Sequence, residues 1–361
     1  MRILFIVGRE LSYQRNEVLL RAFQRVADVD VVGRSTKPRS LILNSLLLSL
    51  SAFPRLLFGH YDLIFIGFYG HLLMLPVGVL SRWRKIPILF DVFVSNYDTL
   101  VDDRKMIRRR SLVSRLAMWL DRTSCGLADH LLIDTRLHAD YFIRTFAIPP
   151  EKLSVLPVGC NEDIFPPSVA LSFPSEPAPK TKVLYYCTYQ PLHGTHIVVQ
   201  AANLLKDENI TFHLIGTGQE YPRAQQLAKD YKLTNLRFTP FVPLMALRDE
   251  IRQADICLGG HFGVSDKANR VIPGKIYQLM AMSRPIIAAD TAANRALLLD
   301  RESALLVPPS DAASLAEAIR TLHENPALRQ NLAQNGYKTY QNTCSETIIT
   351  SQVAEIITQA L

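Results

Sequence analysis

The segment that decides the fold is Asp266-Lys267-Ala268-Asn269-Arg270-Val271-Ile272-Pro273-Gly274-Lys275-Ile276-Tyr277-Gln278-Leu279. Three cations flank a proline-glycine turn, and an apolar helix starts directly after the turn. Such a turn aims backbone N–H groups outward, and the helix adds partial positive charge at its N-terminus. The side chains of Lys267, Arg270 and Lys275 would add full positive charges. The segment therefore predicts a site for a phosphate or diphosphate.

The composition predicts a packed protein of two domains. The chain has 361 residues, of which 48% are hydrophobic and 20% charged, and this length exceeds that of one ordinary core. The net charge of +7 favours anionic partners such as phosphate groups, anionic lipid surfaces or nucleic acid. The five cysteines are scattered, which argues against a zinc site and a disulfide framework and favours a reducing cytoplasm.

Short apolar runs alternate with helical patterns along the chain, which is typical of parallel βαβ units. In the first half we expect strands at 2–7, 29–32, 63–66, 86–91, 130–133 and 153–157. A proline-rich segment follows at 166–181, and a second alternating series begins at Lys182. We expect an N-terminal domain at 1–165, a linker at 166–181 and a C-terminal domain at 182–340. Two such halves place ligands at the carboxyl ends of their strands, in the cleft between them.

No segment is expected to cross a membrane or to direct secretion. The run from Ile3 to Val7 is too short for the core of a signal peptide and is expected to form a buried strand. The longest apolar region extends from Leu41 to Phe58. Asn44, several serines, Pro54 and Arg55 interrupt it, and we expect no membrane span there.

Several short motifs occur in one order along most of the chain, most clearly from Lys182 to Pro309. They are Ala128–Ile133, Leu156–Asn161 with Phe165, Leu192-His193-Gly194, Leu214–Gly218, Phe241-Val242-Pro243, Ala254-Asp255-Ile256, Ile272–Lys275 and Ala281–Ile287. Together they resemble the GT-B-fold glycosyltransferases of the retaining family-4 type. The resemblance implies two Rossmann-like, doubly wound α/β domains facing a central cleft. It also implies a nucleoside-diphosphate sugar as donor, no metal and no other cofactor. A final helix at 341–361 would cross back to the N-terminal domain, as in relatives.

The chain departs from the pattern of that family at three places. Arg270 and Gln278 stand where many members carry two glutamates, and His193 stands where a lysine commonly precedes glycine. The glycine-rich loop that usually follows the first strand is absent, because Arg9 and Glu10 follow Gly8. These departures bear on individual contacts rather than on the fold.

The donor-binding residues are expected in the second half. Lys267 and Arg270 would stabilise the charge on the leaving diphosphate and are taken as catalytic. The other expected donor contacts are His193, Gly194, Gly216, Gly218, Phe241, Val242, Lys275 and Gln278. His193-Gly194 precedes a helix N-terminus, the two glycines at 216 and 218 permit close approach of a nucleotide, and Phe241-Val242 resembles a base-reading segment. For each of these an ordinary structural role remains the alternative, such as a core phenylalanine at 241.

In the first half, Asp91 follows an apolar strand and is expected to face the cleft, where it would orient a sugar hydroxyl or assist proton transfer from the acceptor. Ser95 and Asp98 are supporting candidates, and the alternative role of Asp98, together with Thr99, is to cap the next helix. The segment Gly67–His71 also ends a strand and is a candidate lining of the acceptor pocket.

A basic stretch with apolar residues at helical spacing extends from Arg104 to Arg122 and includes Trp119. Such a stretch fits either a peripheral contact with the inner face of an anionic membrane or a solvated helix face packed on a core. Nucleic acid is not expected as a partner, because few aromatic residues alternate with the basic ones.

The sequence thus predicts a cytoplasmic, metal-independent enzyme that transfers a sugar from a nucleoside-diphosphate sugar to the hydroxyl of a glycan or lipid-linked acceptor. Three alternatives stay open. They are a GT-B sugar-nucleotide epimerase, a nucleotide-sugar-binding protein without catalysis, and an NAD-dependent oxidoreductase. The last is disfavoured because neither half has a complete glycine-rich fingerprint.

Overall fold

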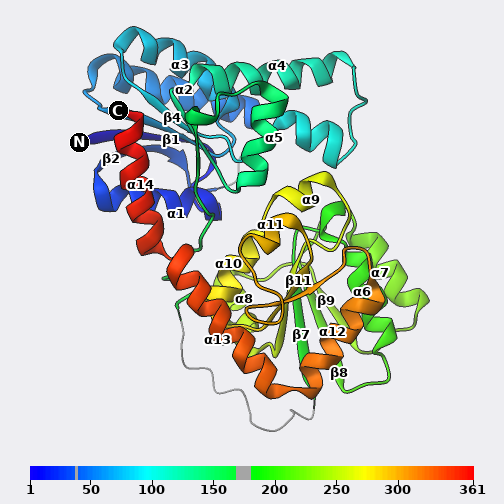
Figure 1. Cartoon of the computed structure of the whole chain (residues 1–361). Coiled ribbons are helices and arrows are strands. Elements are labelled where there is room, and N and C mark those ends of the chain that lie inside the picture. Colours follow the sequence, from blue (N-terminus) through cyan, green and yellow to red (C-terminus); the bar gives the residue numbers. More distant parts are fainter. Residues whose placement is uncertain (37–39, 168–179) are drawn as a thin grey trace. The chain divides into compact units, whose positions relative to one another are not determined.

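The structure is a computed structural model that describes residues 1–36, 40–167 and 180–361. The contacts between residues divide the chain into two compact units. Figure 1 labels their helices and strands. Unit 1 comprises Met1–Gly159 with Glu346–Leu361, and unit 2 comprises Cys160–Ser345. The predicted domains end at 165 and 340, so these divisions fall a few residues from the predicted ones. Residues 168–179 of the predicted linker lie outside the described residues.

Unit 1 contains a parallel sheet with strand order β2-β1-β3-β4-β5-β6. The strands are β1 (Arg2–Glu10), β2 (Asp28–Arg34), β3 (Leu63–Gly67), β4 (Ile88–Asp91), β5 (His130–Ile133) and β6 (Leu153–Val155). Each lies within a few residues of a predicted strand. Their nearly continuous apolar runs fit strands that are buried on both faces.

Helices cover both faces of this sheet. One core packs under α2 (Leu41–Phe58), α3 (His71–Arg84), α4 (Leu112–Leu127) and α5 (Arg136–Phe146), and the other packs under α1 (Gln14–Val26) and α14 (Glu346–Ala360). Glu346 at the start of α14 accepts hydrogen bonds from Arg21 at 2.8 Å and Arg25 at 2.6 Å. These ion pairs and the apolar contacts of α14 with α1 tie the end of the chain to unit 1.

The apolar region from Leu41 to Phe58 forms a single helix that includes its polar residues and Pro54. Its polar residues are accommodated without a break, since Asn44 Nδ2 donates to the Gly8 carbonyl at 2.9 Å and Ser49 Oγ to the Ser45 carbonyl at 2.7 Å. By length and composition α2 is long and apolar enough to cross a membrane, with a mean hydropathy of 1.7, and 28% of it is buried.

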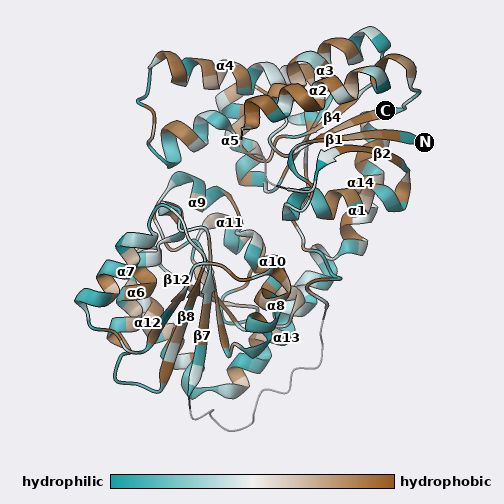
Figure 2. Ribbon diagram, turned by 180° about the vertical axis from the view of Figure 1, so that it is seen from behind, coloured by the Kyte–Doolittle hydropathy of each residue, from teal (hydrophilic) through white to brown (hydrophobic). Residues whose placement is uncertain are grey.

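Unit 2 contains a second parallel sheet, with strand order β12-β11-β10-β7-β8-β9. Its strands are β7 (Thr181–Tyr186), β8 (Ile210–Ile215), β9 (Leu236–Thr239), β10 (Ile256–Gly260), β11 (Ile286–Ala289) and β12 (Leu305–Val307). The helices are α6 (Thr195–Leu204), α7 (Tyr221–Asp230), α8 (Leu244–Gln253), α9 (Asp266–Arg270), α10 (Gly274–Ala281), α11 (Ala292–Arg295), α12 (Ala312–Glu324) and α13 (Pro326–Thr343). Figure 2 shows the apolar strands inside this unit.

Both units therefore have the predicted architecture of a doubly wound α/β domain. In unit 2 the chain leaves β7 toward β8 and β9 on one side and returns to β10, β11 and β12 on the other. The carboxyl ends of β7 and β10 thus lie at a topological switch point, where open parallel sheets bind ligands. In unit 1 the corresponding point lies between β1 and β3.

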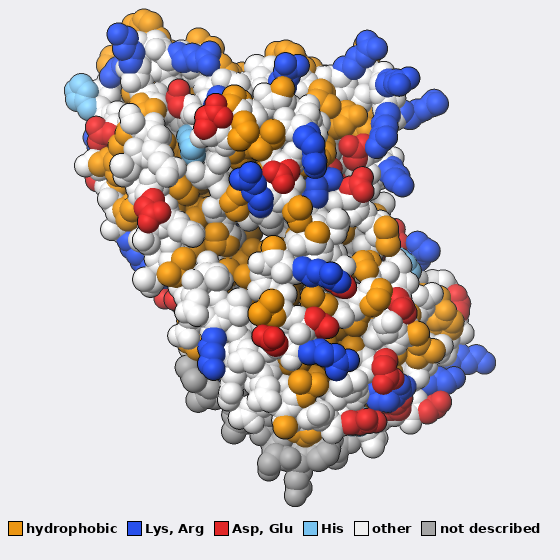
Figure 3. Space-filling view, in the orientation of Figure 1, with side chains coloured by type: hydrophobic (Ala, Val, Ile, Leu, Met, Phe, Trp, Pro, Cys, Tyr) orange, Lys and Arg blue, Asp and Glu red, His pale blue; other side chains and the backbone are white. Residues whose placement is uncertain are grey.

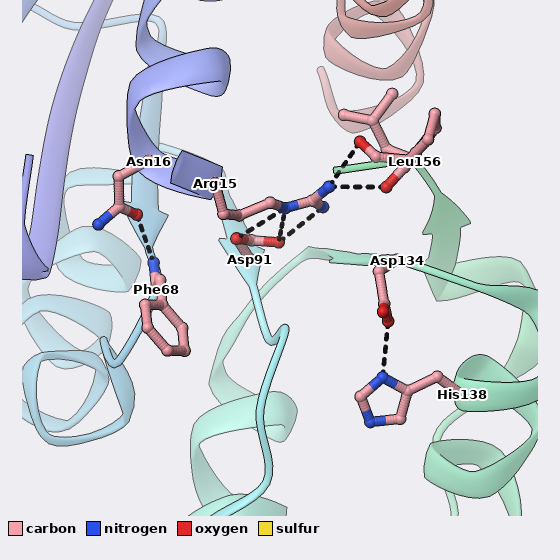
Figure 4. Close-up of polar contacts among 8 residues, drawn as sticks. Arg15, Asn16, Phe68, Asp91, Asp134, His138 and Leu156 are labelled. Atoms are coloured by element: carbon pink, nitrogen blue, oxygen red, sulfur yellow. Dashed lines mark hydrogen bonds and ion pairs between the residues drawn. The ribbon is translucent and has the colours of Figure 1, made fainter. Parts of the chain in front are cut away.

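A buried ion pair joins three segments of unit 1. Arg15 of α1 donates to both oxygens of Asp91 at the end of β4, at 2.9 to 3.2 Å, and neither side chain is exposed. The same guanidinium donates to the carbonyls of Leu156 at 2.7 Å and Pro157 at 2.9 Å, as Figure 4 shows for the Leu156 region. Burial raises the pKa of Asp91, and the Arg15 charge opposes that rise. The pair fixes α1 and β4 against the segment that follows β6.

We expect Asp91→Ala to lower the free energy of unfolding by about 3 to 5 kcal/mol, because it leaves the Arg15 guanidinium buried without its counter-charge. Urea unfolding followed by circular dichroism measures this loss. The control is Arg223→Ala, which removes an exposed pair with Glu220 and should cost less than about 1 kcal/mol. Equal unfolding midpoints for the two variants would contradict the assignment of Asp91 to a core ion pair.

Candidate functional site

The side chain of Lys275 lies buried at the switch point of unit 2, in the first turn of α10. It is 8% exposed, and its Nζ atom lies 4.8 Å from the centre of the Tyr185 ring on β7. Burial lowers the pKa of Lys275 to about 8, and of the described residues only the Cys187 thiol acts to raise it. No carboxylate among the described residues compensates this ammonium, which stays protonated at neutral pH.

The end of β10 brings a glycine against the same ammonium. A Cβ atom on Gly260, which has φ +70°, would lie 3.4 Å from Lys275 Nζ and 3.0 Å from the Tyr185 hydroxyl. Tyr185 donates that hydroxyl to the carbonyl of His193 at 2.7 Å. Residues from β7, β10, α10 and the loop before α6 therefore meet at one place.

Two histidines stand beside Lys275. The rings of His193 and His261 are 5.3 Å apart between centres. Burial lowers the pKa of His193 well below its usual range, and the charge of Lys275 lowers it further. Burial likewise lowers the pKa of His261, with additional effects of His193, Lys275 and Lys267. Both rings are therefore neutral at pH 7.

The tautomer of His193 follows from its backbone contact. His193 Nδ1 accepts a hydrogen bond from the Gln190 N–H at 3.1 Å. The proton of the neutral ring must then lie on Nε2, which makes this atom a donor. His261 Nδ1 is buried and has no hydrogen-bond partner in the described part of the chain. The site thus combines one buried cation with neutral imidazole groups.

The other two predicted cations lie on α9 and are half-buried. Ser265 caps this short helix by accepting from the Ala268 N–H at 3.0 Å, and Asn269 Oδ1 accepts from the Ala292 N–H at 2.9 Å. The charge of Lys267 lowers the pKa of His261, and Arg270 is the last residue of α9. The structure therefore brings Lys267 toward the Lys275 cluster and leaves Arg270 at the end of α9.

Gln278 lies one turn after Lys275 and is buried. Its Oε1 atom accepts a hydrogen bond from the Tyr186 hydroxyl at 2.7 Å. The side-chain carbonyl of Gln278, which was expected to accept a hydrogen bond from a ribose hydroxyl, thus accepts one from Tyr186. An amide oxygen has two lone pairs and can accept two hydrogen bonds.

The three predicted glycines are required by contacts within the protein. A Cβ on Gly194, which has φ +61°, would lie 2.4 Å from the Gly263 nitrogen. A Cβ on Gly216 would lie 1.9 Å from the Cys187 carbonyl oxygen, and one on Gly218 would lie 1.9 Å from that of Thr188. These glycines let the loops at the carboxyl ends of β7, β8 and β10 pack together, and they hold the rim of the site in place.

Phe241 is 77% exposed after the end of β9, so the alternative of a core phenylalanine is wrong. Val242, which follows it, is half-buried. The strand order places these residues two strands from β7, along the same carboxyl edge of the sheet.

In unit 1 the predicted catalytic residue has a structural environment. Both oxygens of Asp91 are bound by Arg15, and its exposure is 1%. Ser95 Oγ donates to the Asp121 carboxylate at 2.7 Å and accepts from the Asp98 N–H at 2.9 Å, so it holds the loop after β4. This geometry gives Asp91 and Ser95 roles in the fold, and we assign no catalysis to them.

The switch point of unit 1 holds an arginine and a tyrosine that the sequence did not single out as site residues. Arg9 at the end of β1 lies over the rings of Tyr13, Phe68 and Tyr69, with its Cζ atom 5.1, 5.6 and 5.8 Å from their centres. The Tyr13 and Phe68 rings stack at 4.3 Å. The predicted segment Gly67–His71 contributes two of these rings. The aromatic residues directly after β3 can be recognised in the sequence. That Arg9 and Tyr13 lie beside them becomes apparent only from the pairing of β1 with β3.

A second polar pair lies near the Arg15–Asp91 pair (Figure 4). Asp134 follows β5, and its Oδ1 atom is 2.6 Å from His138 Nδ1 in the first turn of α5. Both side chains are buried, and within the described residues His138 Nε2 has no hydrogen-bond partner. In the sequence, this pair is indicated only by the spacing of four residues at the start of a helix.

The sequence of the chain is similar to those of known proteins. Residues 180–325 match the family described as Glycosyl transferases group 1. A D-inositol 3-phosphate glycosyltransferase of Geodermatophilus obscurus is 26% identical over 284 residues, which are 73% of this chain and 60% of that protein. The putative colanic acid biosynthesis glycosyltransferase WcaL of Escherichia coli is 23% identical over 180 residues, or 49% of this chain and 43% of the relative. The matches thus span less than two thirds of these curated relatives.

Solved structures match the whole chain. The sucrose-phosphate synthase of Thermosynechococcus elongatus has a TM-score of 0.75 at 18% identity, with 99% of this chain and 98% of that chain covered. HepE of Anabaena, solved in complex with UDP, has a TM-score of 0.71 at 16% identity, with 99% and 100% covered. Residues 180–325 of unit 2 thus resemble the group 1 glycosyl transferases, and the chain as a whole has the GT-B fold.

Proposed function

We propose that the protein transfers a sugar from a nucleoside-diphosphate sugar to an acceptor hydroxyl. The observation that carries the proposal is the uncompensated ammonium of Lys275 at the switch point of a group 1 glycosyl transferase domain. An anion that enters this place would replace the water lost on burial and supply the missing counter-charge. The HepE structure with UDP supports a nucleoside diphosphate as that anion.

In this proposal the bond between the anomeric carbon and the diphosphate oxygen breaks, and its electron pair leaves with the oxygen. The Lys275 ammonium stabilises the negative charge that develops there, and the N–H groups at the start of α10 assist it. His193 Nε2–H is placed to donate a hydrogen bond without adding charge. The acceptor oxygen bonds to the anomeric carbon, and its proton passes to the departing diphosphate oxygen.

Two finer parts of the proposal rest on the resemblance to family-4 enzymes. They are retention of configuration at the anomeric carbon and independence of a metal ion. In support of the second, Lys275 and Lys267 supply fixed positive charge where a divalent cation would otherwise act. Arg270 and Gln278 are proposed to contact the donor in place of the glutamates common in that family.

The nucleoside is proposed to lie along the carboxyl edge of the unit 2 sheet. From the phosphate site at β7 and β10 it would pass Gly216 and Gly218 after β8 and reach Phe241 and Val242 after β9. Neighbouring strands are about 4.8 Å apart, so β9 lies roughly 10 Å from β7. The exposed ring of Phe241 is available there for a base.

The acceptor is proposed to bind unit 1, at the switch point formed by Arg9 and the Tyr13, Phe68 and Tyr69 rings. A glycan or a lipid-linked sugar fits the name of the relative in colanic acid biosynthesis. The cytoplasm is the proposed location, since nucleotide-sugar donors are made there and all five cysteines are free thiols.

We expect UDP, or the matching diphosphate from a panel with GDP and ADP, to raise the Tm of the protein, because a ligand specific for the folded state stabilises it. Lys275→Met should remove at least 90% of this shift, whereas the control Lys229→Met on the exposed face of α7 should retain it. Thermal-shift titrations measure both. A full ligand shift in Lys275→Met would place the diphosphate elsewhere.

We expect the affinity for the diphosphate to fall as the pH rises through about 8, the pKa of Lys275 in the free protein. Below that pH the ammonium is charged, and above it the free site has lost the charge that attracts the anion. Calorimetric titrations between pH 6.5 and 9.5 measure this change. A constant affinity over the range would remove the Lys275 ammonium from the binding site.

We expect Lys275→Met to raise the free energy of unfolding of the ligand-free protein at pH 7 by about 1 to 3 kcal/mol, because it removes a charge whose burial is unfavourable. The advantage should shrink between pH 8 and 10.5. In that window native wild type has lost the proton that its unfolded chain still holds, so wild-type stability rises with pH. Urea unfolding at pH 7 and pH 9.5 measures the difference, and a less stable Met variant at pH 7 would contradict it.

The activity itself is tested with a labelled donor of the nucleotide that stabilises the protein, with and without an acceptor panel. Transfer of label to an acceptor supports the proposal. A rearranged sugar on the nucleotide without acceptor would identify an epimerase, and tight binding without any product across the panel would identify a binding protein. Either of these two results would overturn the transferase proposal.

A further inference from the structure

Helix α2 of unit 1 has its apolar face turned outward. The side chains that face the core are Asn44, Ser45, Leu48, Ala52 and Leu56, of which two are polar. The side chains that face outward include Ile42 at 74% exposure, Leu46 at 56%, Leu50 at 62%, Phe53 at 53% and Phe58 at 81%. A helix that merely covers a soluble core shows the opposite pattern, with charged and polar residues outside.

The apolar surface continues over the neighbouring helices. Helix α3 packs against both α2 and α4 in the layer that covers this face of the sheet. Its Val79 is 66% and its Trp83 is 71% exposed, and on α4 the exposed apolar side chains are Leu112, Val113, Leu116 and Trp119. Figure 2 shows α2 coloured as hydrophobic along most of its length. We call these side chains of α2, α3 and α4 the outer surface, and its extent is typical of an interaction site.

Basic side chains border the outer surface at α4. Lys105, Arg108, Arg109 and Arg110 precede the helix and are exposed, as are Arg115 and Arg122 on it. Of these, Arg109 is paired with a carboxylate, that of Asp102 at 2.9 Å. Figure 3 shows Lys and Arg side chains gathered over this part of unit 1. Positive charge beside exposed apolar helices complements an anionic, partly apolar partner.

A pocket of about 420 Å³ lies within this border. Its lining consists of Tyr97, Arg110, Ser114, Arg115, Met118, Trp119 and Arg122. Three guanidinium groups therefore stand around an apolar and aromatic floor. This combination fits a phosphate-bearing head group whose acyl or glycerol part rests on the ring and the thioether.

We propose that the outer surface docks unit 1 onto a lipid bilayer that carries anionic head groups. The exposed leucines and aromatic rings of α2, α3 and α4 enter the interface, and Arg110, Arg115 and Arg122 bind lipid phosphate. Helix α2 lies along the bilayer and does not cross it. Its inner face shares a core with Leu4 and Ile6 of β1, and Asn44 is hydrogen-bonded to Gly8. This inference is independent of the proposed donor site in unit 2.

Co-sedimentation of the full chain with large unilamellar vesicles tests the proposal. We expect binding to vesicles of phosphatidylglycerol and phosphatidylcholine, strong weakening in 1 M NaCl, and little binding to phosphatidylcholine alone. The triple variant Arg110→Gln, Arg115→Gln, Arg122→Gln should bind on the order of a hundredfold more weakly. The double variant Leu46→Ser, Leu50→Ser should also lose at least tenfold.

The matched control is Arg223→Gln, Lys229→Gln, Arg252→Gln, which removes the same number of exposed positive charges from unit 2 and should bind as wild type does. A far-ultraviolet circular dichroism spectrum like that of the wild type and a cooperative thermal transition show that each variant is folded. Absence of wild-type binding to the anionic vesicles, or an equal loss in the control, would overturn the proposal. So would a dimer in solution that Leu46→Ser, Leu50→Ser dissociates without any vesicle binding, since the outer surface would then join two copies of the chain.

Discussion

The candidate site depends on one buried positive charge that the protein leaves uncompensated. Moving an ammonium group out of water is unfavourable unless a counter-charge or several acceptors replace the lost hydration. Lys275 is 8% exposed and has the face of the Tyr185 ring beside it. A ring offers a weaker attraction than a carboxylate. Burial also keeps His193 and His261 neutral, so neither relieves nor adds to the charge. Burial of this charge lowers the stability of the ligand-free protein. A bound anion relieves that cost, and the relief adds to its binding free energy.

The fold explains why this charge lies where it does. In a doubly wound parallel sheet, the loops after the strands diverge at the switch point and leave space at the carboxyl edge. In unit 2 this space lies between β7 and β10, and the first turn of α10 points Lys275 into it. In unit 1 the equivalent space holds Arg9 among three aromatic rings, while the Arg15–Asp91 pair lies in the core beneath. One architecture thus supports a cationic site in one unit and an aromatic site in the other.

The sequence predicts the strands of both sheets well, because a buried parallel strand is a local apolar run. Position-specific roles are harder to predict when they depend on contacts between distant segments. Asp91 stands at the end of a strand in a way typical of a functional carboxylate, but its partner Arg15 lies 76 residues away. His261 and Tyr185 join Lys275 only through the pairing of β7 with β10, and the sequence analysis named neither. Which face of α2 is exposed likewise depends on the side of the helix against which the sheet packs, and the sequence of α2 alone does not give that side.

The most direct test of the central claim is a crystal structure of the protein soaked with the nucleoside diphosphate that most raises its Tm. We expect a phosphate oxygen within about 2.7 to 2.9 Å of Lys275 Nζ, at the carboxyl ends of β7 and β10. A well-ordered nucleotide bound elsewhere, with the Lys275 side chain still against the Tyr185 ring, would contradict it.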